Sequence, residues 1–505
     1  MQKQICKQGG KRKKKDNLIY INIQIFCQIN LYSGERRVYY YSVLHLLYDI
    51  GEKMENNSLP DNEKCYSFKK ICSVTIPILL SMVMEHIIGM TDTAFLGRVS
   101  EVALGASALG TVYFLVFFVL GTGFSFGIQI LVARRNGEKD FQKIGEICYA
   151  GGFFLILFSI FLAFAVKYLS PVLLPYMIQS PEIGKATGEY LNFRAYGLIF
   201  VFASSIFRSF YVGIASTKIL TVSSVIMVLS NVLLNYALIF GKYGLPRMGI
   251  GGAALASSIA EGIAMCCYIF HLVKCIDLKK YGFYTFSALI DGKILKKVFS
   301  ISFWMMLQPF VAVGVWFIFF LAVERLGERP LAVINLARSL SALPFIIVQS
   351  FATAANSLVS NLLGEEKADQ VWRLINKIQL LAYAIVIPIL LIYTLFPELC
   401  LRIYTDNSEL ISASVNTVYV MSAASFIQCG AYILFNSVSG TGAVKVTVVI
   451  EFLNLLLYLL FVWLIVVKLH PSAAQAWSIE IIYQAITALL SFLYLFYGSW
   501  RNKKI

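Results

Sequence analysis

Charged residues are scarce in this chain of 505 residues: Asp, Glu, Lys and Arg make up only 14% of it. Soluble domains carry about 25% charged residues, and roughly 45–50% of their residues are apolar. Here 58% are hydrophobic and the mean hydropathy is +0.72. This composition excludes an ordinary soluble enzyme, a disordered chain and a collagen-like chain, and it indicates a polytopic membrane protein.

Motifs for nucleotide and metal chemistry are missing as well. The sequence has no G-x-x-x-x-G-K-[ST] phosphate loop and no H-E-x-x-H zinc motif. Its ten cysteines form no Cys-x-x-Cys pair and no His–Cys spacing of a zinc site. We therefore expect no enzyme, no cofactor and no structural metal, and an ion gradient rather than ATP as the energy source.

The net charge of +15 would by itself also suit a nucleic-acid-binding protein. The Lys and Arg residues, however, lie in short clusters between long apolar runs, as they do in the cytoplasmic loops of membrane proteins. We interpret this charge as a signal of membrane topology and expect no nucleic-acid partner.

The first 53 residues differ from the rest. Residues 1–53 hold a basic run and a tract rich in Ile, Gln and Tyr, without the apolar core and cleavage site of a signal peptide. The residues just before Met54, Gly51–Lys53, can be encoded by a purine-rich stretch that resembles a bacterial ribosome-binding site. Our hypothesis is that Met54 is the true start, and we leave residues 1–53 out of the fold prediction.

Twelve apolar segments are long enough for a spanning helix, which needs about 20 residues. Their length and continuity favour helices over the short alternating strands of a barrel. The predicted fold is therefore an all-α polytopic membrane protein. The predicted spans are 71–97, 107–133, 146–169, 190–216, 219–241, 251–274, 298–323, 331–363, 374–396, 411–441, 444–467 and 473–499.

The loops predict the orientation. One set of alternate loops carries about twice as many Lys and Arg residues as the other, and the richer set is expected to face the cytoplasm. Both termini then lie on the cytoplasmic side of a bacterial cytoplasmic (inner) membrane. The long loop 275–297 is predicted to join an N-terminal lobe, 54–274, to a C-terminal lobe, 298–505.

An internal repeat supports these two halves. Three residues at the ends of spans recur 227 positions later: Gly137, Gly213 and Lys218 as Gly364, Gly440 and Lys445. Six spans per half is an even number, so both halves enter the membrane in the same sense. Such parallel repeats are related by a pseudo-two-fold axis along the membrane normal, and they typically enclose a central cavity that opens to alternate sides.

An acid inside the first span is the clearest candidate for function. An ionisable side chain at the middle of a spanning helix costs roughly 2.5–3.5 kcal/mol on insertion scales, so it indicates a functional role. Glu85, Gly89 and Asp92 share one helical face, because they are spaced i, i+4 and i+7. We predict Asp92 as the coupling carboxylate, with Glu85 as a secondary candidate.

Polar residues in spans five and six could complete this site. Asn231 and Asn235 face one way at i, i+4 spacing, and Ser257 is followed one turn later by Glu261, a second secondary candidate. Carboxylate, amide and hydroxyl oxygens suit a hard cation such as Na⁺. The same set could equally hold a proton on Asp92, or the amides could be plain interhelical hydrogen bonds.

The second half lacks matching residues at the repeat positions. A shift of 227 places Phe319 at the position of Asp92, Tyr458 at that of Asn231 and Val462 at that of Asn235. We therefore expect no acid near the equivalent place, and we predict that the coupling cation binds in the first half while the cavity between the halves takes the substrate.

Motifs spread along the chain form a specific set. They are Pro77 with Gly89–Arg98, Gly137 and Gly364, Asn231-x-x-x-Asn235-Tyr236 with Gly241, Gly252–Ser257, and Ser439–Gly442. Together they resemble the multidrug and toxic compound extrusion (MATE) family, and the resemblance covers about residues 68–500.

The resemblance implies a twelve-helix, two-lobe antiporter that expels cationic, often aromatic drugs in exchange for H⁺ or Na⁺. The family's first-lobe cation site uses an Asp of span one, which Asp92 matches. It also uses polar positions of span five, matched by Asn231 and Asn235, and a Thr of span six, where Ser257 stands.

Two departures limit what the resemblance implies. The NorM-type branch carries further acids in spans seven and ten, but Ala312 and Gln428 stand at those places here, which argues against a second-lobe cation site of that type. Some relatives have Asp where this chain has Asn235, so coupling through two acids of the first lobe is not supported.

Other functions are compatible with parts of this pattern. A flippase for a lipid-linked precursor would have a strongly cationic cavity, whereas the candidates here are acids and amides. A narrow-substrate metabolite exporter remains an open alternative. A transporter of the major facilitator type is disfavoured, because this chain lacks the Gly-x-x-x-Asp loop motif of that class. A receptor or scaffold function would leave Asp92 unexplained. Two halves within one chain make a functional monomer in the lipid bilayer the expected state.

Overall fold

The computed structural model describes residues 66–178, 180–284, 292–469 and 471–501. The doubtful segment 1–53 and Met54 lie outside these residues. The helices are α3 (Phe68–Leu96), α4 (Glu101–Gly137), α5 (Gln142–Met177), α6 (Pro181–Gly213), α7 (Lys218–Phe240), α8 (Gly249–Cys275), α9 (Gly292–Glu324), α10 (Glu328–Gly364), the 3-10 helix η3 (Ala368–Gln370), α11 (Val371–Leu395), α12 (Pro397–Leu401), α13 (Ser408–Gly440), α14 (Val444–Phe461), the π-helix η4 (Val462–Lys468) and α15 (Ala473–Tyr497).

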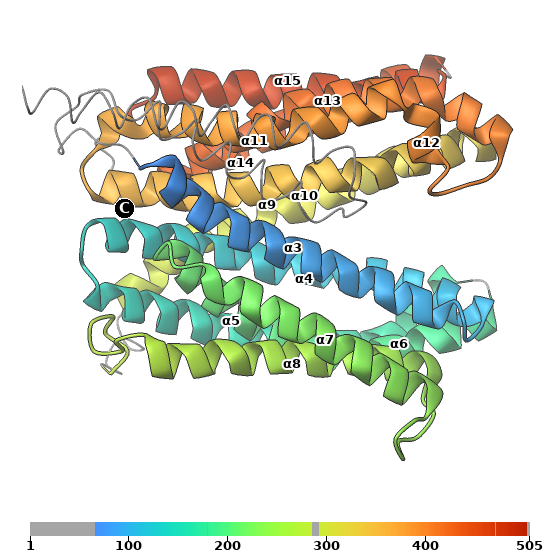
Figure 1. Cartoon of the computed structure of the whole chain (residues 1–505), viewed down its shortest axis with the longest axis horizontal. Coiled ribbons are helices and arrows are strands. Elements are labelled where there is room, and N and C mark those ends of the chain that lie inside the picture. Colours follow the sequence, from blue (N-terminus) through green and yellow to red (C-terminus); the bar gives the residue numbers. More distant parts are fainter. Residues whose placement is uncertain (1–65, 179, 285–291, 470, 502–505) are drawn as a thin grey trace, which may run out of the picture. The chain divides into compact units, whose positions relative to one another are not determined.

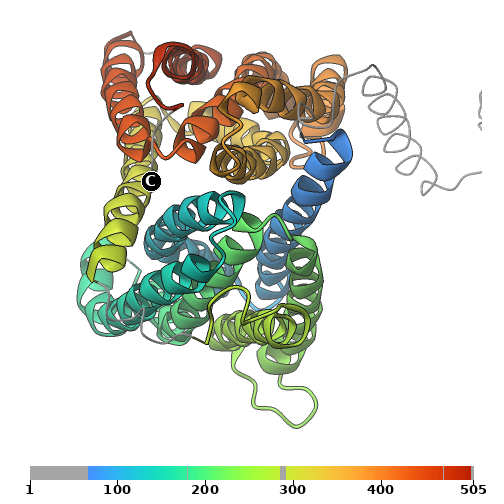
Figure 2. The same cartoon turned by 90° about the vertical axis from the view of Figure 1, so that its left-hand side faces the viewer.

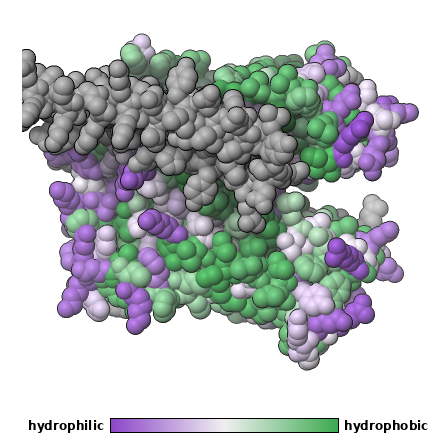
Figure 3. Space-filling model, in the orientation of Figure 1, coloured by the Kyte–Doolittle hydropathy of each residue, from purple (hydrophilic) through white to green (hydrophobic). Residues whose placement is uncertain are grey.

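Twelve of the described helical segments are long and apolar enough to cross a membrane. The predicted all-α fold with twelve transmembrane helices is therefore confirmed. Figure 3 shows how the surface fits this: apolar side chains gather along the middle of the helices and hydrophilic ones lie toward their two ends. Burial of the apolar band in lipid is what holds such helices in the membrane.

Helix ends extend beyond the predicted spans, most clearly at α6. This helix begins at Pro181, whereas hydropathy predicts a start near residue 190. Ser180 caps it by accepting a hydrogen bond from the backbone N–H of Ile183, and the proline at the first helical position needs no donor of its own. A hydropathy profile detects only the apolar part of a helix, so it does not detect the polar N-terminal part of α6.

The internal repeat is visible in the helix bounds. A shift of 227 residues carries both ends of α4 (Glu101–Gly137) onto those of α10 (Glu328–Gly364), and both ends of α6 (Pro181–Gly213) onto those of α13 (Ser408–Gly440). Helices α3–α8 gather in one lobe and α10–α15 in the other (Figures 1 and 2), while α9 packs against α4 and α5 as well as α14.

The two lobes meet along α4 and α10. Gln129 Nε2 donates a 3.1 Å hydrogen bond to Asn356 Oδ1, and these two residues are 227 positions apart. Repeat-equivalent residues can contact each other only near the axis that relates the halves, so the pseudo-two-fold axis passes between them. Further along the same helices Gly137 approaches Gly364, and a Cβ atom built on either glycine would lie 2.9 Å from the Cα of the other.

Helix α3 is the loosely packed member of the first lobe, because no other helix of the described residues runs close to its backbone over an extended length. Polar contacts tie it down instead. Pro77 leaves the carbonyl of Ser73 without its helical N–H partner. The hydroxyl of Thr217, just before α7, lies 3.2 Å from that carbonyl oxygen and 2.9 Å from that of Val74, so it donates between the two. Midway along the helix, Ser81 bonds to Ser224 of α7 at 2.7 Å.

Candidate functional site

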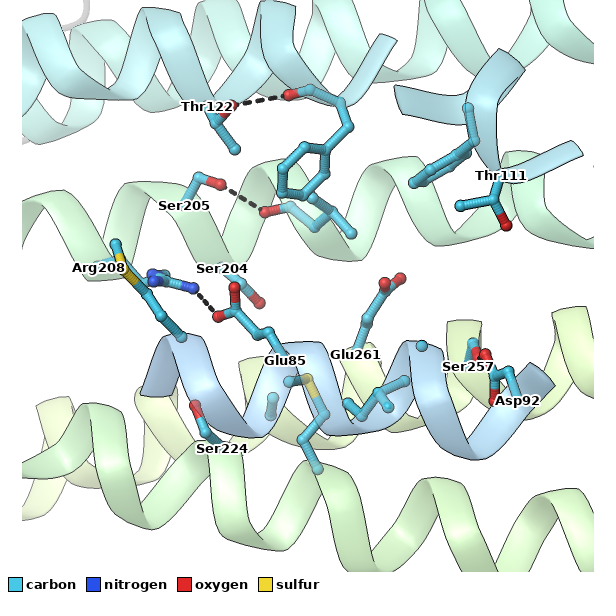
Figure 4. A pocket seen from close by; sticks show the side chains of 18 of the residues that line it. Glu85, Asp92, Thr111, Thr122, Ser204, Ser205, Arg208, Ser224, Ser257 and Glu261 are labelled. Atoms are coloured by element: carbon cyan, nitrogen blue, oxygen red, sulfur yellow. Dashed lines mark hydrogen bonds and ion pairs between the residues drawn. The ribbon is translucent and has the colours of Figure 1, made fainter. Parts of the chain in front are cut away.

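A cavity of about 890 Å³ lies in the N-terminal lobe, a size typical of ligand pockets. Its walls come mainly from α3, α4, α6, α7 and α8, and α10 of the other lobe contributes Gln349 and Thr353. In Figure 4, Glu85, Glu261 and Asp92 are spaced along the cavity, with Ser257 beside Asp92. All three acids and Ser257 line it.

The four predicted site residues converge on one carboxylate. Asp92 Oδ1 accepts hydrogen bonds from Asn235 Nδ2 at 2.6 Å and from Asn231 Nδ2 at 3.3 Å. Its Oδ2 accepts from the hydroxyl of Ser257 at 2.8 Å. Three helices, α3, α7 and α8, thus meet at this carboxylate.

Burial makes this cluster well suited to hold a small cation. Asn231 and Asn235 are fully buried and Ser257 is 4% exposed. The side-chain nitrogen of Asn235 donates to Asn231 Oδ1 at 3.0 Å. The side-chain oxygen of Asn235, Oδ1, is buried and has no hydrogen-bond partner. An orphan buried carbonyl beside a carboxylate is an acceptor with unused capacity, which a proton on the carboxyl or an oxygen-seeking cation would use.

Local sequence explains why the cluster forms. Asn231 and Asn235 are one turn apart on α7, so both amides reach the same point. Gly89 lies one turn before Asp92, and a Cβ atom at Gly89 would meet nothing within 4 Å. The space beside Asp92 is therefore open toward the cavity and is not filled by another helix.

The secondary candidates are held in ion pairs. The Glu261 carboxylate accepts hydrogen bonds from both terminal guanidinium nitrogens of Arg194, at 2.6 and 2.8 Å. Glu85 forms an ion pair with Arg208. Both arginines come from α6. The structure places Glu85 and Glu261 in the cavity wall, where each carboxylate is neutralised by an arginine.

Sequence reasoning missed these two arginines. Arg194 and Arg208 both fall within the predicted fourth span, so the rule that marks an ionisable residue inside a span as functional also applies to them. Arg194 in addition lies over the ring of Phe114, 4.2 Å from its centroid, which is a cation–π contact.

Asp92 differs from its neighbours in lacking a base. No described Lys, Arg or His lies within ion-pair distance of it. The charged cavity-lining residues are Glu85, Asp92, Glu101, Glu261, Arg194 and Arg208. Four acids face two bases, so the ionised lining carries an excess of negative charge.

A Gly-x-Ser-x-Gly pattern also occurs, at Gly123–Gly127, and this pattern can mark the nucleophile of a hydrolase. Here it lies in the middle of α4, and Ser125 donates to the backbone carbonyl of Thr122 at 2.7 Å. Nucleophile turns connect a strand to a helix, so the pattern has no catalytic meaning at this position.

We expect replacement of Arg194 by Ala to destabilise the protein by about 3–5 kcal/mol, because Glu261 would be left as a buried charge without a partner. The double variant Arg194→Ala with Glu261→Gln should regain most of this loss. Thermal unfolding of purified protein in detergent measures both. Equal destabilisation by the single and the double variant would contradict the pairing.

Comparison with known proteins agrees with this geometry. The MatE family model matches the chain twice, over residues 77–237 and 305–464, so each half carries one copy. The two matches cover more than half of the chain. This chain belongs to the MatE family. The C-terminal ends of the two matches, residues 237 and 464, are 227 positions apart, which is the offset that relates the helices.

Individual relatives show the same relationship. The "Probable multidrug resistance protein NorM" of Thermotoga maritima is 24% identical over 89% of this chain and 96% of its own length. The outward-facing structure of a multidrug resistance MATE family transporter superposes with a TM-score of 0.79 at 16% identity, over 86% of this chain and 97% of that one. The fold is therefore that of a MATE transporter, and the chain is a multi-pass membrane protein.

A second solved structure with a TM-score of 0.79 and 16% identity is a MOP superfamily transporter from Pyrococcus furiosus. It covers 86% of this chain and 97% of its own. Its authors report a binding pocket of reverse polarity that suggests a different function.

Proposed function

We propose that this MatE-family protein is a secondary antiporter that exports small organic cations, including drugs, across the cytoplasmic membrane in exchange for H⁺ or Na⁺. The observation that carries the proposal is the unpaired carboxylate of Asp92 in the wall of a drug-sized cavity whose ionised lining is acidic. A cationic substrate and a coupling cation would both be attracted to this negative charge.

Coupling follows from that shared charge. A proton or Na⁺ on Asp92 removes one negative charge from the cavity, so it weakens the attraction for an organic cation. Each ligand thereby lowers the affinity for the other, which is the differential binding that exchange requires. Asn231, Asn235 and Ser257 would orient the carboxylate and, for Na⁺, supply additional oxygen ligands.

Aromatic side chains favour the same substrate class. Phe114, Phe118, Phe126, Tyr190 and Tyr268 line the cavity. Aromatic faces attract organic cations and stack on planar rings. A planar aromatic cation such as ethidium therefore suits both the charge and the walls, whereas a phosphate-bearing lipid precursor would face an acidic lining.

The direction and setting of transport complete the proposal. The loops rich in Lys and Arg would face the cytoplasm, together with both termini, in the inner membrane of a bacterium. One chain carries both repeat halves, and the cavity needs only residues of that chain, so we propose the monomer as the working unit. NorM relatives named for multidrug resistance support export as the physiological direction.

The experiment that tests this proposal is transport by the purified chain in proteoliposomes. We expect an imposed H⁺ or Na⁺ gradient to drive accumulation of ethidium at least about tenfold above protein-free vesicles, and dissipating that gradient with an ionophore to abolish it. Running the two gradients separately identifies the coupling ion.

An anionic dye of similar size is the matched control substrate, and it should not accumulate. Transport of the anionic dye without transport of ethidium would contradict the cation assignment. Movement of a fluorescent lipid-linked sugar in the same vesicles, again without ethidium transport, would instead favour a flippase.

A further inference from the structure

The C-terminal lobe contains a counterpart of the Asp92 cluster. A shift of 227 residues carries Asp92, Asn231 and Ser257 onto Phe319, Tyr458 and Gln484. In the structure, the rings of Phe319 and Tyr458 are 6.0 Å apart, and the Tyr458 hydroxyl donates to Glu480 Oε1 at 2.8 Å. The side-chain amide of Gln484, one turn further along α15, also interacts with the Glu480 carboxylate.

This arrangement corrects the sequence-based expectation that the second half has no acid near the equivalent place. The acid is present, but it is supplied by α15 rather than by the helix that corresponds to α3. Glu480 corresponds to Ala253 of the first half. Adding the repeat offset to the position of Asp92 therefore does not identify Glu480.

A second carboxyl lies on the neighbouring helix α14, and its tyrosine partner contacts that of the first. Glu451 of α14 is 6% exposed and accepts a 2.8 Å hydrogen bond from the hydroxyl of Tyr483. The rings of Tyr458 and Tyr483 contact each other at 5.5 Å, so two carboxyl–tyrosine pairs stand side by side between α14 and α15. Trp316 of α9 adds a further donor to Glu480, at 3.3 Å.

No base neutralises these two carboxyls among the described residues. Tyr432 of α13 lies near both of them, and Arg338 of α10 lies over the ring of Phe320. The N-terminal cavity, in contrast, pairs two of its acids with arginines. Two carboxylates without a base, one buried (Glu451) and one partly buried (Glu480), are costly inside the membrane unless each carries a proton or shares a bound cation.

Two buried amide oxygens on the same two helices, α14 and α15, have no hydrogen-bond partner. Asn454 and Gln484 are 1% and 3% exposed, and Asn454 Oδ1 and Gln484 Oε1 are both unpartnered. Asn454 Nδ2 donates to the carbonyl of Tyr483 at 2.9 Å and to the hydroxyl of Thr487 at 2.6 Å, which fixes its side chain between the two helices. Gln484 is held toward Glu480, so its free oxygen belongs to the same cluster.

We propose that Glu480, Gln484, Glu451 and Asn454 form a second binding site for a monovalent cation, H⁺ or Na⁺, in the C-terminal lobe. Carboxylate and amide oxygens are the donor set that a hard cation requires. The site lies on α14 and α15, away from the positions of Ala312 and Gln428. Its use in coupling rests on the proposed antiport, whereas cation binding itself does not.

The test uses the intrinsic fluorescence of Trp316, which touches Glu480, in the purified full chain. We expect Na⁺ titration at fixed ionic strength, or pH titration in the absence of Na⁺, to change this fluorescence. The Trp316→Phe variant should lose the change, which assigns the signal. Asp92→Asn should retain it, because the two sites are separate.

Glu480→Gln should lower the apparent cation affinity at least tenfold or remove the transition. The matched control is Glu398→Gln, an exposed acid of the same lobe, and its titration should match the wild type. A Glu480→Gln titration that also matches the wild type overturns the proposal, as does a transition that disappears in Asp92→Asn.

Two further measurements keep the test decisive. If Glu480→Gln does not give a monodisperse protein, Gln484→Leu removes one of the free oxygens without touching a carboxyl and should weaken Na⁺ binding. A response to Na⁺ at constant pH identifies Na⁺, and a response to pH alone identifies H⁺. An unchanged affinity in both Gln484→Leu and Glu451→Gln would reject the site even if antiport through Asp92 holds.

Discussion

Replacing Asp92 with Asn is expected to reduce ethidium export to the level of cells without the transporter, a loss of at least about tenfold. Asparagine has nearly the same size and can still accept a hydrogen bond from Asn235 and donate one to Ser257, so the helices should remain packed. It cannot release a proton or provide a negative charge for Na⁺. The expected loss is therefore one of coupling and not of folding.

The measurement is efflux from energised cells that lack their own exporters, at equal membrane abundance of each variant. Glu101→Gln is the matched control, because Glu101 lines the same cavity but lies exposed in the first turn of α4. Its efflux should remain within about twofold of the wild type. Full efflux by Asp92→Asn would place coupling elsewhere, with Glu261 and Glu85 as the next candidates.

Much of the fold and the first-lobe site could be predicted from the sequence, because both rest on short-range rules. A spanning helix requires a continuous apolar run, and two residues four apart on a helix share a face. These rules suffice to bring Asn231 and Asn235 together. The repeat offset adds the correspondence between halves, which the helix bounds confirm.

Contacts between helices could not be predicted in the same way. The pairing of Arg194 with Glu261 depends on how α6 and α8 pack, and a single sequence does not give that. The Glu480 carboxyl illustrates a second limit. A repeat preserves the place of a site but not which helix supplies its acid, so position-by-position mapping finds Phe319 and misses the charge beside it.

A methyl group added at Gly364 is expected to slow transport at least tenfold while leaving the protein folded. A Cβ atom at this position would lie 2.3 Å from the carbonyl oxygen of Arg134 and 2.8 Å from the amide nitrogen of Glu138, both in the opposite lobe. Overpacking costs about 1–3 kcal/mol. The clash exists only in the conformation in which the two lobes are in contact at Gly364. It therefore raises the free energy of that conformation relative to the one in which the lobes separate at this point.

Alternating access needs both conformations at comparable free energy, and a bias of about 1.4 kcal/mol changes their ratio tenfold. Gly364→Ala should therefore lower the ethidium export rate, and spin labels at Tyr243 and Asp406 in a cysteine-free chain should report a shifted distance distribution. Gly314→Ala is the control, because a Cβ atom there meets nothing within 4 Å. Wild-type transport and distances in Gly364→Ala would show that the contact between Gly137 and Gly364 does not limit the cycle.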